Sequence, residues 1–152
     1  MQEIIVSDTS CLILLDKINK LNILKLIYKE VFVTNVVAEE YKKPLPKFIK
    51  IKNPSDIDFQ QKLEITLDKG EASSIVLAME NNNHLLIIDE LKGRKKALDL
   101  KLNITGTIGV FIIAKEKGFI QSVSNILFEI EKTNFRISKN FIKEIKKQCN
   151  EL

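Results

Sequence analysis

The stretch Ile4-Ile5-Val6-Ser7-Asp8-Thr9-Ser10 decides the fold of this 152-residue chain. Three β-branched residues run into a carboxylate and two hydroxyl residues, and an apolar run at residues 11–15 follows with helical spacing. This order is typical of a strand that ends and passes into a helix. We therefore expect Asp8 at the carboxyl end of a strand, the edge at which open parallel α/β sheets bind their ligands.

The rest of the chain alternates strand and helix patterns in the same way. Strands are predicted at residues 30–34, 85–89 and 104–105, with an extended piece at 48–51. Helices are predicted over residues 36–43, 60–67, 71–80, 92–102 and 106–117, with two more near the C-terminus. Strands separated by helices indicate a parallel sheet with right-handed crossovers. We expect an α/β fold, a three-layer α/β/α sandwich around a parallel sheet of four or five strands.

Length and composition favour a single domain. A chain of this size buries roughly 70% of its unfolded surface in one core, so we expect one domain over residues 1–152, with basic C-terminal helices from about 122 to 151. Because no apolar run reaches about eighteen residues and no signal-peptide pattern is found, we expect a cytoplasmic protein that binds no membrane. Cys11 and Cys149 fit neither a disulfide framework nor a metal site and are expected to be reduced structural thiols.

The formal net charge of +4 is unevenly distributed. Residues 132–152 hold six basic and two acidic side chains, and residues 42–52 hold basic side chains and no acid. Both stretches would attract phosphate groups if they faced a site. Lysine-rich surfaces are also commonly just solvated, so the charge alone leaves both interpretations open.

Four carboxylates are expected to meet at one edge of the sheet. Asp8 and Asp89 each directly follow an apolar strand, and parallel strands end at the same edge. Glu40 and Glu71 lie near the starts of helices that begin there. Ionised oxygens about 4 Å apart repel by about 4 kcal/mol at an effective dielectric of about 20, so this cluster needs a proton, a lysine or a cation. Carboxylates without a cysteine or histidine cluster favour Mg²⁺ or Mn²⁺.

Each acid also has a purely structural interpretation. Asp8 and Asp89 can cap the helices that follow them. Glu71 in a first helical turn interacts with the helix dipole by about 0.3–1 kcal/mol, and Glu40 alone fits a solvated helix face. The functional interpretation therefore rests on the set of four and not on any single member.

Five segments resemble the PIN-domain family in order and spacing. They are Ser7-Asp8-Thr9-Ser10, Val36-Val37-Ala38-Glu39-Glu40-Tyr41, Gly70-Glu71-Ala72 with Ile75 and Leu77-Ala78, Ile87-Ile88-Asp89-Glu90 with Gly93-Arg94, and Thr105-Gly106-Thr107-Ile108-Gly109-Val110. The resemblance covers nearly the whole chain up to about residue 120. It is closest to a prokaryotic PIN-like subfamily related to the VapC-type toxin ribonucleases of toxin–antitoxin modules.

The resemblance implies a ribonuclease that depends on Mg²⁺ or Mn²⁺. Its catalytic and metal-binding quartet would fall on four positions of this sequence, which are Asp8, Glu40, Glu71 and Asp89. Ser10 matches the hydroxyl residue that supports the site in the family, Glu39 is the alternative to Glu40, and Glu90 stands beside Asp89. In such enzymes the metal activates a water for in-line attack on a phosphodiester, so no covalent protein nucleophile is required.

The leading hypothesis is therefore an endoribonuclease that cleaves RNA, either a toxin with an antitoxin protein as partner or an RNA-processing factor. A second hypothesis is an inactive PIN-like module that binds RNA or a protein, which the basic C-terminal helices also favour. A phosphatase with Asp8 as nucleophile would need a second acid two residues later, where Ser10 stands. A homodimer is compatible with the amphipathic C-terminal helix, whose apolar face fits equally well on the protein's own core.

The remaining polar residues give weaker signals. His84 precedes a strand and is the only histidine, which favours a surface or strand-edge role over that of a general base. Arg94 would contact a phosphate, pair with a site carboxylate or lie on a solvated helix face. The segment Gly106-Thr107-Ile108-Gly109 lacks the lysine and spacing of a phosphate-binding loop, which disfavours nucleotide triphosphates.

Overall fold

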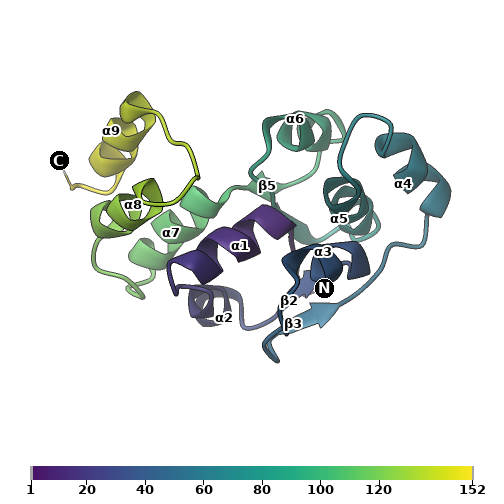
Figure 1. Ribbon diagram of the computed structural model, residues 1–152, viewed down its shortest axis with the longest axis horizontal. Helices are drawn as coiled ribbons and strands as arrows, with labels where there is room; N and C mark the ends of the chain where they lie inside the picture. The colour runs from purple at the N-terminus through teal and green to yellow at the C-terminus, as the bar shows by residue number, and fades with distance from the viewer. Residues whose placement is uncertain (1, 152) are drawn as a thin grey trace.

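Five parallel strands form the central sheet of the computed structural model, which describes residues 2–151 (Figure 1). The strands are β1 (Ile4–Ser7), β2 (Val31–Val33), β3 (Ile49–Ile51), β4 (His84–Ile87) and β5 (Ile104–Thr105). Their order across the sheet is β3-β2-β1-β4-β5, and every neighbouring pair is parallel. The expected parallel sheet is confirmed.

Helices connect the strands and extend the chain beyond β5. They are α1 (Thr9–Lys17), α2 (Asn22–Tyr28), α3 (Asn35–Tyr41), α4 (Ile57–Leu63), α5 (Lys69–Met79), α6 (Leu91–Asp99), α7 (Thr107–Glu116), α8 (Val123–Glu131) and α9 (Lys139–Gln148). The helix predicted at residues 60–67 was placed wrongly. It begins at Ile57 because the Asp56 side chain accepts a hydrogen bond from the Phe59 backbone N–H at 3.0 Å and caps it.

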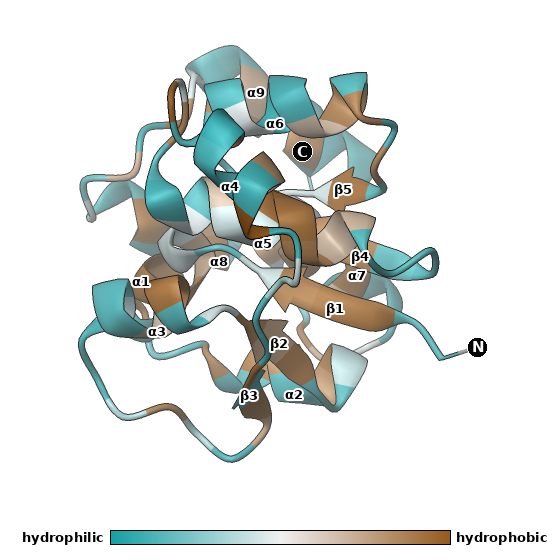
Figure 2. Ribbon diagram, turned by 90° about the vertical axis from the view of Figure 1, so that its right-hand side faces the viewer, coloured by the Kyte–Doolittle hydropathy of each residue, from teal (hydrophilic) through white to brown (hydrophobic). Residues whose placement is uncertain are grey.

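Helices cover both faces of the sheet. Successive residues of a strand point to opposite faces, so neighbouring residues of β1 contact different helices. Ile5 belongs to a buried cluster with side chains of α1, α2, α7, α8 and α9, whereas Val6 belongs to a second cluster with α4, α5 and α6. Figure 1 shows α7–α9 at one end of the molecule and α4–α6 at the other, with β2, β3 and α1 between them. In Figure 2 the strands are brown, whereas α4 and α6 carry mostly hydrophilic residues. The three-layer fold is confirmed.

The chain reverses its direction across the sheet between β1 and β4. It builds β2 and β3 on one side of β1, then crosses back to place β4 and β5 on the other. Ser7 pairs with Ile87 at the carboxyl ends of these two strands, and the Asp8 N–H donates to the Ile87 carbonyl at 3.0 Å. Ligands of open α/β sheets bind at such a reversal, so Asp8 lies where a binding site is expected.

His84 has the expected strand-edge role at the start of β4. It is buried, its Nε2 accepts a hydrogen bond from the Asn103 backbone N–H at 3.0 Å, and its Nδ1 lies 2.7 Å from the Asn81 carbonyl oxygen. Cys11 and Cys149 are free buried thiols, as predicted. None of the helices within residues 2–151 combines the length and the apolar character needed to cross a bilayer.

One carboxylate fixes the C-terminal end of the described chain. Glu151 accepts hydrogen bonds at 2.8 Å from Val123 N, Ser124 N and Ser122 Oγ at the start of α8, and Lys115 Nζ on α7 donates to it at 2.5 Å. Burial of this carboxyl opposes ionisation, but the bonds from Lys115, Ser124 and Val123 outweigh it and hold the pKa of Glu151 well below its usual range. The ionised carboxylate therefore ties α7 and α8 to the C-terminus.

We expect Glu151→Gln to lower the free energy of unfolding by about 2 kcal/mol at pH 7, because it removes a charged acceptor shared by several donors. Since the folded-state pKa lies below the unfolded value near 4.5, the stabilisation is complete above that value and declines as the pH falls through it. Urea unfolding at pH 7 and pH 3.5 measures this, with Glu144→Gln on the exposed face of α9 as control. Equal stability of the two variants at pH 7 would contradict the assignment.

Candidate active site

Asp8 is buried at the junction between β1 and α1, with only 3% of its surface exposed. It occupies the N-cap position of α1, but its side chain makes no capping hydrogen bond. The structural interpretation of Asp8 as a helix cap is therefore not supported. Asp8 instead lines a hollow at the carboxyl edge of the sheet.

This hollow, which we call the acidic hollow, has a volume of about 260 Å³. Residues of α1, α3, α5 and the positions just before α1, α5 and α6 line it, and they are Asp8, Thr9, Ser10, Ile13, Glu40, Asp68, Glu71 and Glu90. Five of these eight residues are acidic and none is basic. No lysine lines the acidic hollow, so none is available there to neutralise the carboxylates.

Glu40 reaches the acidic hollow through a hydrogen bond with Thr9. The Thr9 hydroxyl donates to Glu40 Oε1 at 2.7 Å. Gly70 leaves the room for this carboxylate, because a Cβ at position 70 would collide with Glu40 Oε1. Glu39 does not line the hollow and instead accepts a hydrogen bond from Asn35 Nδ2 at 3.2 Å on the exposed side of α3. Of the two candidates for the second acid, Glu40 is the one at the site.

Glu71 lies in the first turn of α5 and is 6% exposed. Its Oε1 accepts a hydrogen bond from the Asp68 backbone N–H at 3.3 Å, which is one half of a capping box at the start of α5. The second oxygen lies near α6, where a Cβ on Gly93 would be 3.3 Å from Glu71 Oε2. Capping therefore accounts for one oxygen of this buried carboxylate, and Glu71 also lines the acidic hollow.

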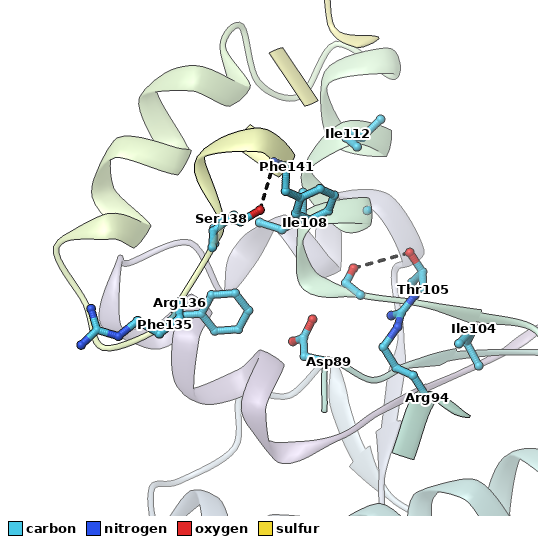
Figure 3. Close-up of a pocket in the computed structure, with 13 residues that line it drawn as sticks. Asp89, Arg94, Ile104, Thr105, Ile108, Ile112, Phe135, Arg136, Ser138 and Phe141 are labelled. Atoms are coloured by element: carbon cyan, nitrogen blue, oxygen red, sulfur yellow. Dashed lines mark hydrogen bonds between the residues drawn. The ribbon is translucent and has the colours of Figure 1, made fainter. Parts of the chain in front are cut away.

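Asp89 does not line the acidic hollow. Its Oδ1 accepts a hydrogen bond from the Thr107 backbone N–H at 2.8 Å, and its Oδ2 accepts one from the Thr107 hydroxyl at 2.5 Å. Together with Arg94 it lines the neighbouring cavity drawn in Figure 3. A Cβ on Gly106 would lie 2.9 Å from Asp89 Oδ1 and 3.0 Å from Arg94 Nη1, so a larger residue would press on both side chains. The structure thus brings Asp8, Glu40 and Glu71 together and places Asp89 at the adjoining wall.

The other predicted residues are placed as follows. Ser10 is exposed and lines the acidic hollow, and Glu90 lines it from the N-cap position of α6. Arg94 donates from Nη1 to the Ile88 carbonyl at 2.7 Å, so it braces the end of β4 and does not pair with an acid of the hollow. Asp68 also lines the hollow but was not predicted as a site residue, although its spacing to Glu71 is the signature of a capping box.

Burial and mutual repulsion perturb the acids. Burial, together with the charges of Glu71, Glu40 and Asp89, raises the pKa of Asp8 to about 7, against a hydrogen bond from the Thr9 backbone that lowers it. Burial also raises the pKa of Glu71, with the charges of Asp68, Glu90 and Glu40 acting in the same direction and a hydrogen bond from the Asp68 backbone opposing them. The site therefore favours a bound proton or a bound cation.

The donors fit a hard divalent cation. Oxygen-only ligands with excess negative charge are those preferred by Mg²⁺ and Mn²⁺, and Asp8, Glu40 and Glu71 are the carboxylates available in the hollow. Within residues 2–151, however, no three histidine, cysteine or acidic side chains are already arranged as ligands of one ion. The chemistry of the donors thus fits such an ion, and their side chains would have to turn toward it.

In the absence of divalent metal, stability should fall as the pH rises from 5 to 8. The folded-state pKa of Asp8, about 7, lies above the unfolded value of 3.8, so stability is greatest below the unfolded value and is lost as Asp8 ionises in the folded protein. Each pKa unit corresponds to about 1.4 kcal/mol, which makes the loss a few kcal/mol. Thermal melts in EDTA should show this decline, and Asp8→Asn should remove most of it. The exposed Glu39→Gln control should keep it; a decline as steep in Asp8→Asn would contradict the assignment.

Comparison with known proteins agrees with this architecture. A family model described as a PIN domain matches residues 4–151. Searches among curated proteins and among solved structures returned no match. Because the family model matches nearly the entire chain, from the first strand to the end of the described C-terminus, this protein belongs to the PIN-domain family.

Proposed function

We propose that this protein is a metal-dependent endoribonuclease that hydrolyses RNA phosphodiester bonds. The observation that carries the proposal is the acidic hollow, which has five carboxylates and no basic side chain in its lining and lies where the strand order reverses. PIN domains are generally nucleases, which agrees with this chemistry. The proposal makes Asp8, Glu40, Glu71 and Asp89 the catalytic and metal-binding residues.

Asp8, Glu40 and Glu71 would hold Mg²⁺ or Mn²⁺, because their carboxylates share the acidic hollow. The ion would supply a Lewis acid that lowers the pKa of water and offsets charge on the phosphodiester. Thr9 orients Glu40 through its hydroxyl. Asp8, held partly protonated near neutral pH by its surroundings, would release that proton when a cation replaces it.

Asp89 is the fourth member of the proposed set, and Thr107 fixes its position. Each Asp89 oxygen accepts one hydrogen bond from Thr107, and a carboxylate oxygen has a second lone pair available. The negative charge of Asp89 also acts on Asp8, whose pKa it raises. Asp89 therefore contributes to the field of the acidic hollow while its carboxylate stands at the wall of the next cavity.

The role of toxin in a toxin–antitoxin module is the narrower form of this proposal. A small gene for an antitoxin beside the gene of this protein would support it. An RNA-processing enzyme would use the same site without such a neighbour.

An inactive PIN-like module that binds RNA or a protein partner is the second candidate. The observation that favours it is the absence, within residues 2–151, of three side chains already set as ligands of one ion. Titration with Mn²⁺ followed by electron paramagnetic resonance separates the two candidates. The nuclease should bind Mn²⁺ measurably and Asp8→Asn should weaken that binding, whereas an inactive module should leave the Mn²⁺ spectrum unchanged.

Cleavage of single-stranded RNA should require Mg²⁺ or Mn²⁺ and should fall by about a hundredfold or more in Asp8→Asn and in Asp89→Asn, because each change removes a charge from the proposed metal site. A gel assay of end-labelled RNA measures this, with circular dichroism to confirm folding. The neighbouring Glu39→Gln variant is the matched control and should keep its activity. Unchanged cleavage in both folded aspartate variants would overturn the proposal.

A further inference from the structure

Three hollows are linked by shared lining residues, and two of them lie along α1. The acidic hollow shares Ser10 and Ile13 with a second hollow of about 230 Å³, which Lys17 and Asn134 also line. That second hollow shares Phe135 with the cavity beside Asp89. We call this series of shared hollows the trough. It runs from the carboxylates, past Ile13 and Lys17, to the segment between α8 and α9.

The cavity at the far end of the trough has a volume of about 480 Å³. Its polar and aromatic lining residues are Asp89, Arg94, Thr105, Phe135, Arg136, Ser138 and Phe141. Figure 3 shows the ring of Phe135 and the carboxylate of Asp89 turned toward the same space, and the guanidinium of Arg136 turned outward from it. We call this space the aromatic cavity.

We propose that the aromatic cavity binds an unpaired nucleobase of single-stranded RNA, whose backbone runs along the trough to the acidic hollow. This inference rests on the proposed function and assigns the part of the protein that would hold the substrate on one side of the cleavage site. It makes Phe135 the residue on which the base stacks and Arg136 the residue that meets the adjacent phosphate.

The size and lining of the aromatic cavity fit a nucleotide. Pockets of roughly 300–1,000 Å³ hold small organic ligands, and the volume of about 480 Å³ lies within that range. Every kind of nucleobase can stack on an aromatic side chain, so this contact does not depend on the RNA sequence. Phe141 is 46% exposed, and Phe135 is only partly buried. Both rings therefore present apolar surface that a base would cover.

The backbone holds Phe135 in place before any ligand binds. The Thr133 hydroxyl donates to the Ile130 carbonyl at the end of α8, and the Phe135 N–H donates to Thr133 Oγ1 at 3.1 Å. Ser138 Oγ then accepts from the Phe141 N–H at 3.1 Å and caps α9. Both rings come from a segment with defined hydrogen bonds on each side, so the backbone that carries them is preorganised.

The charges along the trough fit a phosphate backbone. The only two arginines of the chain, Arg94 and Arg136, both line the aromatic cavity. The ion pairs of residues 2–151 are all made by lysines, so neither guanidinium is neutralised by a salt bridge. Lys17 adds a third cation in the middle of the trough, where its Nζ donates to Asn134 Oδ1 at 3.0 Å. The cationic side chains thus attract phosphates to the aromatic cavity. At the acidic hollow, a bound cation would be needed to offset the repulsion between the carboxylates and a phosphate.

A single strand fits this geometry better than a duplex or a peptide. The bases of a duplex are paired and stacked on one another, so none is free to enter a cavity, whereas unpaired bases can be splayed onto aromatic rings. A protein segment would match the rings, but it would not supply the repeated negative charge that Lys17, Arg94 and Arg136 call for along the trough.

Affinity for a labelled ten-nucleotide single-stranded RNA tests the inference in full-length protein that carries Asp8→Asn to prevent cleavage. Fluorescence anisotropy with Mg²⁺ present gives the dissociation constant. Adding Phe135→Ala should weaken binding by about tenfold or more, because one stacked base is lost. The matched control is Phe128→Ala on α8, which is 62% exposed and lines none of the three hollows of the trough. It should bind as the parent does.

A scan with one abasic nucleotide at successive positions identifies the bound base. One position should weaken binding to the parent by about tenfold and should have little further effect on Phe135→Ala, because both changes remove the same contact. Arg136→Gln, which changes an exposed side chain, should weaken binding and reduce its dependence on salt. Circular dichroism confirms that each variant is folded.

Equal affinities of Phe135→Ala and Phe128→Ala, or an abasic effect that persists in Phe135→Ala, would overturn the inference and would leave the aromatic cavity to a protein partner. The proposed function fails separately, through absence of cleavage by the unsubstituted protein with Mn²⁺. If cleavage is absent but RNA binding depends on Phe135, the cavity is correct and the catalytic proposal is not. If cleavage is present and Phe135→Ala binds normally, the catalytic proposal is correct and the aromatic cavity does not bind a base.

Discussion

Repulsion among carboxylates at the carboxyl edge of the sheet is the constraint on which the site depends. Asp8 and Glu71 are both nearly fully buried, and Glu40, Asp68 and Glu90 line the same hollow. Charges this close in a partly dehydrated space favour protonation or a cation, and burial followed by the neighbouring acids raises the pKa of Asp8 to about 7. A protein that gains nothing from this cluster would be more stable without it, which is why the cluster indicates function.

The fold supports this unfavourable arrangement from its rigid parts. Asp8 follows a central strand, and its backbone N–H bonds to the carbonyl of Ile87 on the next one. Gly70 and Gly106 leave room for Glu40 and Asp89, whose carboxylates are held by Thr9 and Thr107. Glu40, Glu71 and Asp89 are thus each positioned by a neighbouring hydroxyl or a backbone N–H, and no basic side chain lines the hollow. This leaves the net negative charge of the hollow available to a ligand.

Much of this arrangement was predictable from the sequence, because it depends on local patterns. The apolar runs before Asp8 and Asp89 predicted parallel strands, and the position of Glu71 near a helix start predicted that it would reach the same edge. Glu40 also lines the hollow, but the reason given for it was wrong, because α3 ends at Tyr41 and Glu40 therefore lies in the last turn of its helix. The orientation of Asp89 was not predictable, since it depends on Thr107 from a different strand–helix junction. The aromatic cavity was not predictable either, because Phe135 and Arg94 are 41 positions apart in the sequence and line one cavity only in the folded chain.

The most direct test of the central claim is the position of a divalent ion in the folded protein. A crystal soaked in Mn²⁺ and measured for anomalous scattering should show a peak in the acidic hollow, within about 2.0–2.6 Å of carboxylate oxygens that include one from Asp8. An anomalous map without a peak in that hollow, at a Mn²⁺ concentration that supports RNA cleavage, would contradict the account.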